Sequence, residues 1–230
     1  SEPLPDVDFD LSLIPENINQ TKAAKIAKDL AGVSEVRKQI ALDALQFAVD
    51  PDNLPNYMLS FYGRGKNLYN NDLSLNVATK AKLDSYFRNG NYAPYYDGGR
   101  QEVMEEAALE SNYTIPYSDC SGEIVGLSKK WCATIIDGVR KIVSSGFDAN
   151  ANTLISRYAT PTDNPQPGDW AWRDGHIGLY VGGAIVVEHV GGAYGCAASI
   201  VSNRRVYSFL DRKTHKMGGW TSFGSPVFYK

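Results

Sequence analysis

The chain has little of what marks several specialised classes of protein. Its three cysteines, an odd number in 230 residues, exclude a regular disulfide framework. No apolar run approaches the length of about 18 residues that a membrane-spanning helix requires. The sequence also shows no basic start followed by an apolar stretch, the pattern of a signal peptide. A net charge of −3 gives no electrostatic reason to expect a nucleic-acid partner. These absences leave a globular protein.

The composition agrees with that class. Hydrophobic residues make up 43% of the chain and charged residues 21%. A chain of this length can form one large domain, or one domain with a smaller partner. No C-x-x-C or H-x-x-x-H pair is present, so we expect no metal and no cofactor. Cys132 is expected in the core, and a bond between Cys132 and Cys196 in an oxidising environment is left open.

A cysteine stands where a helix is expected to begin. After Ser118-Asp119-Cys120-Ser121-Gly122, apolar residues recur at steps of three and four, which indicates one face of a helix; they are Ile124, Leu127, Trp131, Ile135 and Val139. Asp119 or Ser118 is the expected N-cap. The free N–H groups and the positive end of the helix dipole there favour the thiolate form of Cys120. The pattern therefore predicts a nucleophile, which also needs a base.

The base is sought in a predicted hairpin. Two β-rich runs flank Gly182-Gly183, which is typical of a two-residue turn. In that register His176 lies directly opposite His189, with Cβ atoms about 4.5–5.5 Å apart. One imidazole would take the thiol proton, and the other would orient it. The same alternation puts Glu188 on the opposite face, and a slip of one residue would exchange Glu188 and His189.

These segments together resemble the NlpC/P60 superfamily of cell-wall cysteine peptidases. The family typically shows D-C-S-G, then P-G-D, then G-H-V-G-I-Y-x-G, then a third polar residue, often His. The corresponding segments are Asp119-Cys120-Ser121-Gly122, Pro167-Gly168-Asp169, Gly175-His176-Ile177-Gly178-Leu179-Tyr180-Val181-Gly182 and His189. The resemblance covers about residues 90–230, and its strength lies in the order and spacing of four motifs.

The resemblance implies a fold and a set of roles. The fold would be α+β and papain-like, with the catalytic helix packed on an antiparallel sheet. Cys120 would be the nucleophile, His176 the general base and acid, and His189 the group that orients His176. The family also places a tyrosine from a P-Y-x-x-G-G string near the oxyanion. Tyr95 fits that string, followed by a helix-like insertion over Arg100–Glu110, whereas Tyr117 lies closer in sequence to the cysteine.

Further substrate candidates and the domain division follow from the same segments. Asp119 and Ser121 flank Cys120 and join the two tyrosines as oxyanion or substrate candidates.

We expect an extended acidic arm or linker over residues 1–19 and a helical region over 20–90. That region would include one helix ending before Gly32 and a second capped by Ser34. The catalytic domain is expected over residues 91–230.

The resemblance implies a peptidoglycan hydrolase that cleaves an amide bond in stem peptides. Three alternatives stay open. One is a CHAP-type amidase or endopeptidase that cuts the sugar–peptide or cross-bridge bond. Another is a protein-directed deamidase or transferase on the same fold, and the third is a wall-binding module with an inactive site. The expected partner is bacterial peptidoglycan, with no nucleic acid and no membrane span. The expected location is extracellular or the cell wall, with a phage tail or a larger parent polypeptide, reached through the N-terminal arm, as a further setting.

Overall fold

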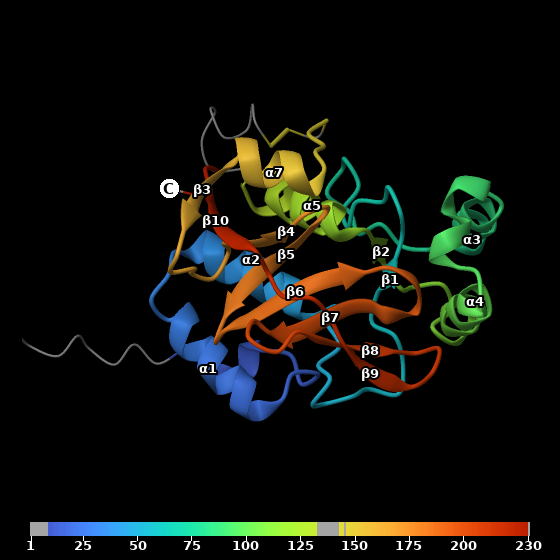
Figure 1. Cartoon of the computed structure of the whole chain (residues 1–230), viewed down its shortest axis with the longest axis horizontal. Helices are drawn as coiled ribbons and strands as arrows, with labels where there is room; N and C mark the ends of the chain where they lie inside the picture. The colour runs from blue at the N-terminus through green and yellow to red at the C-terminus, as the bar shows by residue number, and fades with distance from the viewer. Residues whose placement is uncertain (1–8, 133–142, 145, 230) are drawn as a thin grey trace, which may run out of the picture.

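The computed structural model describes residues 9–132, 143–144 and 146–229 and has a mixed α+β fold. A six-stranded sheet lies at its centre, in the order β3-β10-β4-β5-β6-β7, and every neighbouring pair is antiparallel. A parallel pair, β1-β2, and a hairpin, β8-β9, lie outside this sheet. The expected α+β class with an antiparallel sheet is confirmed (Figure 1).

The elements have the following bounds. The α-helices are α1 (Gln20–Leu30), α2 (Glu35–Leu45), α3 (Lys80–Phe87), α4 (Arg100–Glu110), α5 (Cys120–Cys132) and α7 (Ala151–Arg157). The 3₁₀ turns are η1 (Leu11–Leu13), η2 (Gly90–Tyr95) and η3 (Gly192–Tyr194). The strands are β1 (Phe61–Tyr62), β2 (Tyr117–Ser118), β3 (Ala159–Thr162), β4 (Trp170–Arg173), β5 (His176–Gly182), β6 (Ile185–Val190), β7 (Gly195–Ile200), β8 (Arg205–Ser208), β9 (Lys213–Lys216) and β10 (Ser222–Pro226).

Helices α1, α2 and α5 cover one face of the central sheet (Figure 1). Helix α1 is capped by Asn19, whose side-chain oxygen accepts from two backbone N–H groups of the first turn. The buried side chains of α1, including Ile26 and Leu30, pack against every second side chain of β5, namely those that point toward the helices. The main hydrophobic core lies between these helices and the sheet.

The opposite face of the sheet carries less apolar packing. Ala171, Tyr180 and Val186 form a small cluster there, against which Trp220 and Phe223 pack. A second small cluster brings Val206 of the β8-β9 hairpin against β6 and β7. Between these two clusters the strand residues are polar, and the site described below occupies this part of the face.

Helices α3 and α4 belong to a second core at one side of the sheet (Figure 1). Leu83 and Tyr86 of α3 and Met104 of α4 pack there with residues of β1 and β2, namely Phe61 and Tyr117. Helix α4 has the bounds expected for the helix-like insertion.

The two cores do not follow the expected division at residues 90 and 91. The first core joins α1 and α2 to the sheet, and the second joins α3 to α4 across the boundary. The described part of the expected arm is also not free: Ile14 and Ile18 are buried in the main core, and Asn17 donates to the carbonyls of Leu45 and Ala48. Two isoleucines among polar residues are enough to anchor this segment. Residues 1–8 lie outside the described part.

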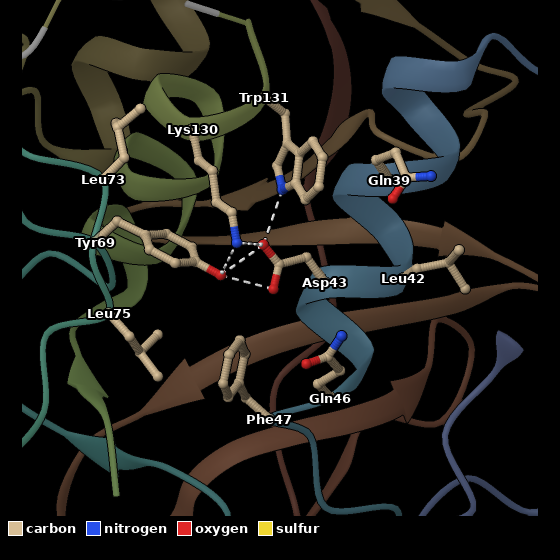
Figure 2. A pocket seen from close by; sticks show the side chains of 10 residues that line it. All are labelled: Gln39, Leu42, Asp43, Gln46, Phe47, Tyr69, Leu73, Leu75, Lys130 and Trp131. Atoms are coloured by element: carbon tan, nitrogen blue, oxygen red, sulfur yellow. Dashed lines mark hydrogen bonds and ion pairs between the residues drawn. The ribbon is translucent and has the colours of Figure 1, made fainter. Parts of the chain in front are cut away.

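A buried carboxylate joins α2 to α5 (Figure 2). Asp43 accepts from the Tyr69 hydroxyl at 2.7 and 2.6 Å and from the Trp131 indole N–H at 2.8 Å. The Lys130 ammonium lies 3.3 Å from the same carboxylate and donates to the Tyr69 hydroxyl oxygen. This network forms the floor of a hollow of about 460 Å³. Buried polar groups of this kind are stabilising because each has a partner.

The cysteines and the helices bear on four of the expectations stated above. All three cysteines are free and buried, so the bond between Cys132 and Cys196 that was left open is not formed. Cys132 is a core residue, as expected. Among the described helices none is long and apolar enough to cross a membrane. The expected continuation of the Cys120 helix to Val139 lies outside the described residues beyond Cys132.

Candidate active site

Helix α5 begins at Cys120, and Asp119 caps it. One carboxylate oxygen of Asp119 accepts from the backbone N–H of Gly122 at 2.7 Å and from the Ser121 hydroxyl at 3.2 Å. The other oxygen accepts from the N–H of Gly65 at 2.8 Å. Burial raises the pKa of Asp119, although these hydrogen bonds oppose the shift. The expected cap is confirmed, and it also ties a distant loop to the start of the helix.

That loop, residues 63–67, lies directly against the first turn of α5. The N–H of Asp119 donates to the carbonyl of Lys66 at 3.0 Å, and the N–H of Leu68 donates to the carbonyl of Gly122 at 3.2 Å. A Cβ on Gly122 would lie 2.0 Å from the Lys66 oxygen. Glycine is therefore required at Gly122 for the loop to reach the helix.

The structure brings His176 to Cys120. His176 is the first residue of β5, and its side chain is 18% exposed. Burial lowers the pKa of His176, but a hydrogen bond with Cys120 and the interaction with Glu188 raise it more, to about 9. An imidazole with this pKa is protonated at neutral pH, which suits a thiolate–imidazolium pair with the neighbouring sulfur.

The expected pairing of His176 with His189 is wrong because the hairpin has a different turn and a bulge. The two loop residues are Gly183 and Ala184, with φ of 59° and 58°, rather than Gly182 and Gly183. Beyond the turn the register shifts between Tyr180 and Gly182, so that one residue of β5 is unpaired. This extra residue exchanges the two faces of β6 relative to β5.

Contact with α1 accounts for the position of the turn. The N–H of Gly183 donates to the Asp29 carboxylate at 2.7 Å. A Cβ on Gly183 would lie 2.9 Å from the backbone nitrogen of Ile26. Ala184 accepts the left-handed conformation at the next position, where a glycine would be less strained. A tertiary contact therefore overrides the local preference for a Gly-Gly turn.

Glu188, and not His189, lies on the face that carries His176. Its Oε1 is 3.6 Å from Nε2 of His176, and its side chain is fully buried. Arg204 holds the same carboxylate with bonds of 2.9 and 2.9 Å from Nε and 2.7 Å from Nη2. Burial raises the pKa of Glu188, but His176 and Arg204 lower it more, so the net shift is downward. A carboxylate anion therefore faces the His176 ring.

Two features bring the carboxylate and the ring together. Gly178 lies next to the last observed pair, Leu179 with Val187, and a Cβ at Gly178 would approach the Cβ of Glu188 to 3.2 Å. The missing side chain leaves Glu188 free to reach diagonally to His176. On its other side, the His176 ring stacks on Trp220, with centroids 5.4 Å apart and planes 10° apart. Arg204 lies over the same indole, 4.9 Å from its centroid.

His189 points to the helix-covered face instead. Its Nδ1 is 3.0 Å from Oε2 of Glu123 on α5, and its Nε2 is 2.7 Å from the hydroxyl of Ser60. It is fully buried. His215, in the β8-β9 hairpin, pairs with Asp211 at an exposed position.

A tyrosine that the sequence analysis did not select lies beside the cysteine. Burial raises the pKa of Tyr62, and the neighbouring charges of Cys120 and Asp119 raise it further. Tyr95, one of the two expected tyrosines, stacks on Tyr62 with centroids 5.4 Å apart and so lies one ring further out. Tyr117 is buried in the second core. Glycines follow Tyr62 at the first and third positions, Gly63 and Gly65, a spacing that differs from the P-Y-x-x-G-G string and therefore did not indicate this tyrosine.

A hollow of about 410 Å³ opens beside the start of α5. Asp119 and Ser121, the two expected neighbours of the nucleophile, line it together with Arg64, Asn67 and Asn150. The Arg64 guanidinium interacts with the Tyr62 hydroxyl and lies 5.5 Å from the centroid of the Tyr95 ring. This hollow shares no residue with the one around Asp43 in Figure 2.

The described residues include one group of potential metal ligands. Glu123, His189 and Cys196 place three ligand atoms within 4.8 Å of one another, and all three residues are buried. The group lies on the helix-covered face and does not include Cys120 or His176.

Comparisons of the chain with protein-family models, with curated proteins and with solved structures found no match.

Proposed function

We propose that the chain is a cysteine endopeptidase of the NlpC/P60 type that cleaves an amide bond in the stem peptides of peptidoglycan. Cys120 is the nucleophile, His176 the general base and acid, and Glu188 the group that orients His176. The observation that carries the proposal is that Cys120, at the capped start of a buried helix, lies close enough to His176 to raise its pKa, while Nε2 of the same ring lies 3.6 Å from the buried carboxylate of Glu188.

The reaction follows from these positions. The thiolate of Cys120 attacks the amide carbonyl, and the imidazolium of His176 then gives its proton to the leaving amine. Water, deprotonated by the same imidazole, attacks the acyl-enzyme and releases the acid and the thiol. Glu188 keeps the ring oriented and stabilises its positive charge, as a buried carboxylate does in other triads.

The charge that develops on the carbonyl oxygen has two donors nearby. The backbone N–H of Cys120 lies at the unpaired start of α5. The hydroxyl of Tyr62 is near enough to Cys120 and Asp119 for their charges to raise its pKa. Each donor of this kind stabilises the transition state by about 3–4 kcal/mol in measured cases.

The arrangement of elements also favours this function. A helix that starts at the nucleophile and packs on an antiparallel sheet carrying the base is the papain-like layout, with cysteine before histidine along the chain. The location follows from the substrate and is the cell wall or the extracellular space, free or as part of a phage particle. The exposed hollow beside Asp119 and Ser121 is the place for the peptide.

The test is digestion of purified cell walls by the full chain and by Cys120→Ala. We expect the variant to lose activity by several orders of magnitude while its fold is kept, because alanine has no thiolate to attack the amide carbonyl. Cys132→Ala, which removes a buried thiol from the core, is the control and should digest walls. Equal rates for the wild type and Cys120→Ala would overturn the proposal.

The products separate the proposed reaction from its alternatives. Mass spectrometry of the released muropeptides identifies the bond that is cut. Cleavage within the stem peptide supports the proposal, whereas a cut at the sugar–peptide or cross-bridge bond indicates the CHAP-type reaction. Binding without cleavage indicates a wall-binding module. Inactivity on walls, with Cys120 still reactive towards thiol reagents, directs the search to protein substrates.

A further inference from the structure

A chain of buried hydrogen bonds runs between α5 and the central sheet. Oε2 of Glu123 lies 3.0 Å from Nδ1 of His189, and the Ser60 hydroxyl lies 2.7 Å from Nε2 of the same ring. The Ser60 hydroxyl in turn donates to the carbonyl of Pro116 at 3.3 Å. Glu123, His189 and Ser60 are each at most 1% exposed. The proposed reaction uses none of these residues.

The hydrogen bonds of this buried row all point the same way, from donor to acceptor, when its side chains are neutral. Burial raises the pKa of Glu123, although its contact with His189 opposes the shift. The protonated carboxyl then donates from Oε2 to Nδ1, and Nε2–H donates to the Ser60 oxygen. The remaining oxygen of Glu123 has no hydrogen-bond partner among the described residues, which is less costly for a neutral acid than for an anion.

Each member stands beside a residue of the candidate site. Glu123 lies one turn after the nucleophile on α5, and His189 follows the orienting carboxylate along β6. Ser60 precedes β1 and is two residues before Tyr62. Pro116 precedes β2, which leads directly into α5. The hydrogen bonds therefore join the elements that carry the site from the side that water does not reach.

A metal site is the other use that this group could have. In the hydrogen-bonded chain, however, both nitrogens of the His189 ring are engaged, so neither has a free lone pair for an ion. Burial raises the pKa of Cys196, the third member of that group, well above its ordinary value, so its thiol stays protonated. The contacts fit a structural chain of hydrogen bonds better than a coordination sphere.

We infer that His189 is a positioning residue which, together with Glu123 and Ser60, holds α5 against β6 and β1 so that the Cys120 sulfur stays in contact with His176. This inference rests on the proposed function, because it takes Cys120 as the nucleophile. It assigns His189 no contact with the substrate. Small displacements of a reacting group can cost about 100-fold in rate, so a fixed spacing is worth maintaining.

The experiment measures the rate at which Cys120 is alkylated by iodoacetamide over a range of pH, followed by mass spectrometry on the full chain. For His189→Ala and Glu123→Ala we expect the rate at neutral pH to fall by about 100-fold. We expect their pH profiles to move towards that of an ordinary thiol, because the sulfur is no longer held against the imidazolium. Glu123→Gln keeps a neutral donor to Nδ1 and should react within about twofold of the wild type.

Two controls separate positioning from general destabilisation. Val187→Ala removes a buried side chain from β6, on the same face as His189, and leaves the hydrogen bonds of Glu123, His189 and Ser60 in place. It should therefore lower the free energy of unfolding and leave the alkylation profile unchanged. Ser60→Ala removes a single hydrogen bond and should give an intermediate rate; it also serves if His189→Ala fails to fold.

The outcomes are decisive in both directions. A wild-type profile for both His189→Ala and Ser60→Ala would overturn the inference, as would a loss in Glu123→Gln equal to that in Glu123→Ala. The alkylation readout needs no wall substrate. An unreactive Cys120 in the wild-type chain would therefore refute the proposed function itself, whereas a reactive Cys120 that does not respond to His189 refutes only the positioning role.

Discussion

The charge of the His176 ring depends on one residue of the neighbouring strand. Glu188 is an anion held by Arg204, and it faces His176 across the space that Gly178 leaves open. A single carboxylate in this position both orients the ring and favours its protonated form. Glu188 and the neighbouring Cys120 are therefore the two residues that together raise the pKa of His176.

The pH dependence of activity tests this role. His176 has a pKa of about 9, raised from its ordinary value, so activity should fall as the pH rises through about 9 and the imidazolium that protonates the leaving amine is lost. Glu188→Gln removes the negative charge that raises this pKa, so the alkaline fall should move to lower pH. The measurement is kcat/KM on a soluble stem peptide across the pH range.

A surface acid provides the control for that shift. Glu110→Gln, at the exposed end of α4, should leave the profile unchanged. An alkaline fall at the same pH in Glu188→Gln and in the wild type would show that Glu188 does not act on His176. Removal of Glu188 also leaves Arg204 without its buried partner, so the stability of the variant should be measured in parallel.

At the scale of secondary structure, the β5-β6 hairpin decides which side chains meet. The turn at Gly183-Ala184 and the extra residue between Tyr180 and Gly182 together put Glu188 on the face of His176 and His189 against α5. The inserted residue therefore puts Glu188 on the face of the sheet that carries His176, and its neighbour His189 on the face that α5 covers.

Gly178→Ala tests the importance of close strand contact. A Cβ at Gly178 would lie 2.6 Å from a methyl group of Val186, 3.0 Å from the carbonyl of Val187 and 3.2 Å from the Cβ of Glu188. We expect the variant to lose about 1–3 kcal/mol of stability and to lose activity beyond what that destabilisation explains, because Glu188 is displaced from His176. Chemical denaturation and the hydrolysis rate below the unfolding transition measure the two effects.

The matched glycine is Gly219, where an added Cβ would meet no atom within 4 Å. Gly219→Ala should be close to neutral in both measurements. If Gly178→Ala retained full activity, the proposed approach of Glu188 to His176 across this position would not be needed.

At the scale of the whole molecule, the N-terminal helices share one core with the elements that carry the candidate site. Arg37 of α2 donates to the Asp169 carboxylate at 2.7 Å and to the carbonyl of Pro167 at 2.9 Å, so the P-G-D segment is held by a helix far away in sequence. Asp43 in turn joins α2 to α5 (Figure 2). The sheet and the nucleophile helix both depend on α2 for buried polar partners.

Residues 91–230 alone should therefore fail to fold. Without α1 and α2 the main core loses Ile26, Leu30, Ile40 and Leu45, and one face of β5 is exposed. Circular dichroism and thermal unfolding of the fragment and of the full chain measure this directly. A fragment that unfolded cooperatively and kept the hydrolytic activity would contradict it.

Point variants give the same test within the intact chain. Leu30→Ala, at a fully buried position on α1, should destabilise the whole chain by about 2–5 kcal/mol in a single transition. Leu109→Ala, at a position on α4 that is 66% exposed, should have almost no effect. Two separate transitions in Leu30→Ala would indicate that the N-terminal helices fold as a unit of their own.

Much of this molecule could be predicted from local patterns. The apolar spacing after Asp119 predicted the start of α5 at Cys120, and the capping chemistry of Asp119 acts over only three residues. The breaks at Gly32 and Ser34 likewise separated α1 from α2, and the α+β class followed from such elements. Helix periodicity and caps are short-range properties, so the residues themselves determined them.

Only the tertiary structure decided which side chain of β6 faces His176 and which tyrosine lies near the cysteine. The hairpin register depended on the contact of Gly183 with α1, and the place of Tyr62 depended on the docking of residues 63–67 onto α5. Both are contacts between segments far apart in the chain, so local sequence patterns do not contain them. Local preference does not decide between two hairpin registers or between several tyrosines, and the packing of distant segments selects one of each.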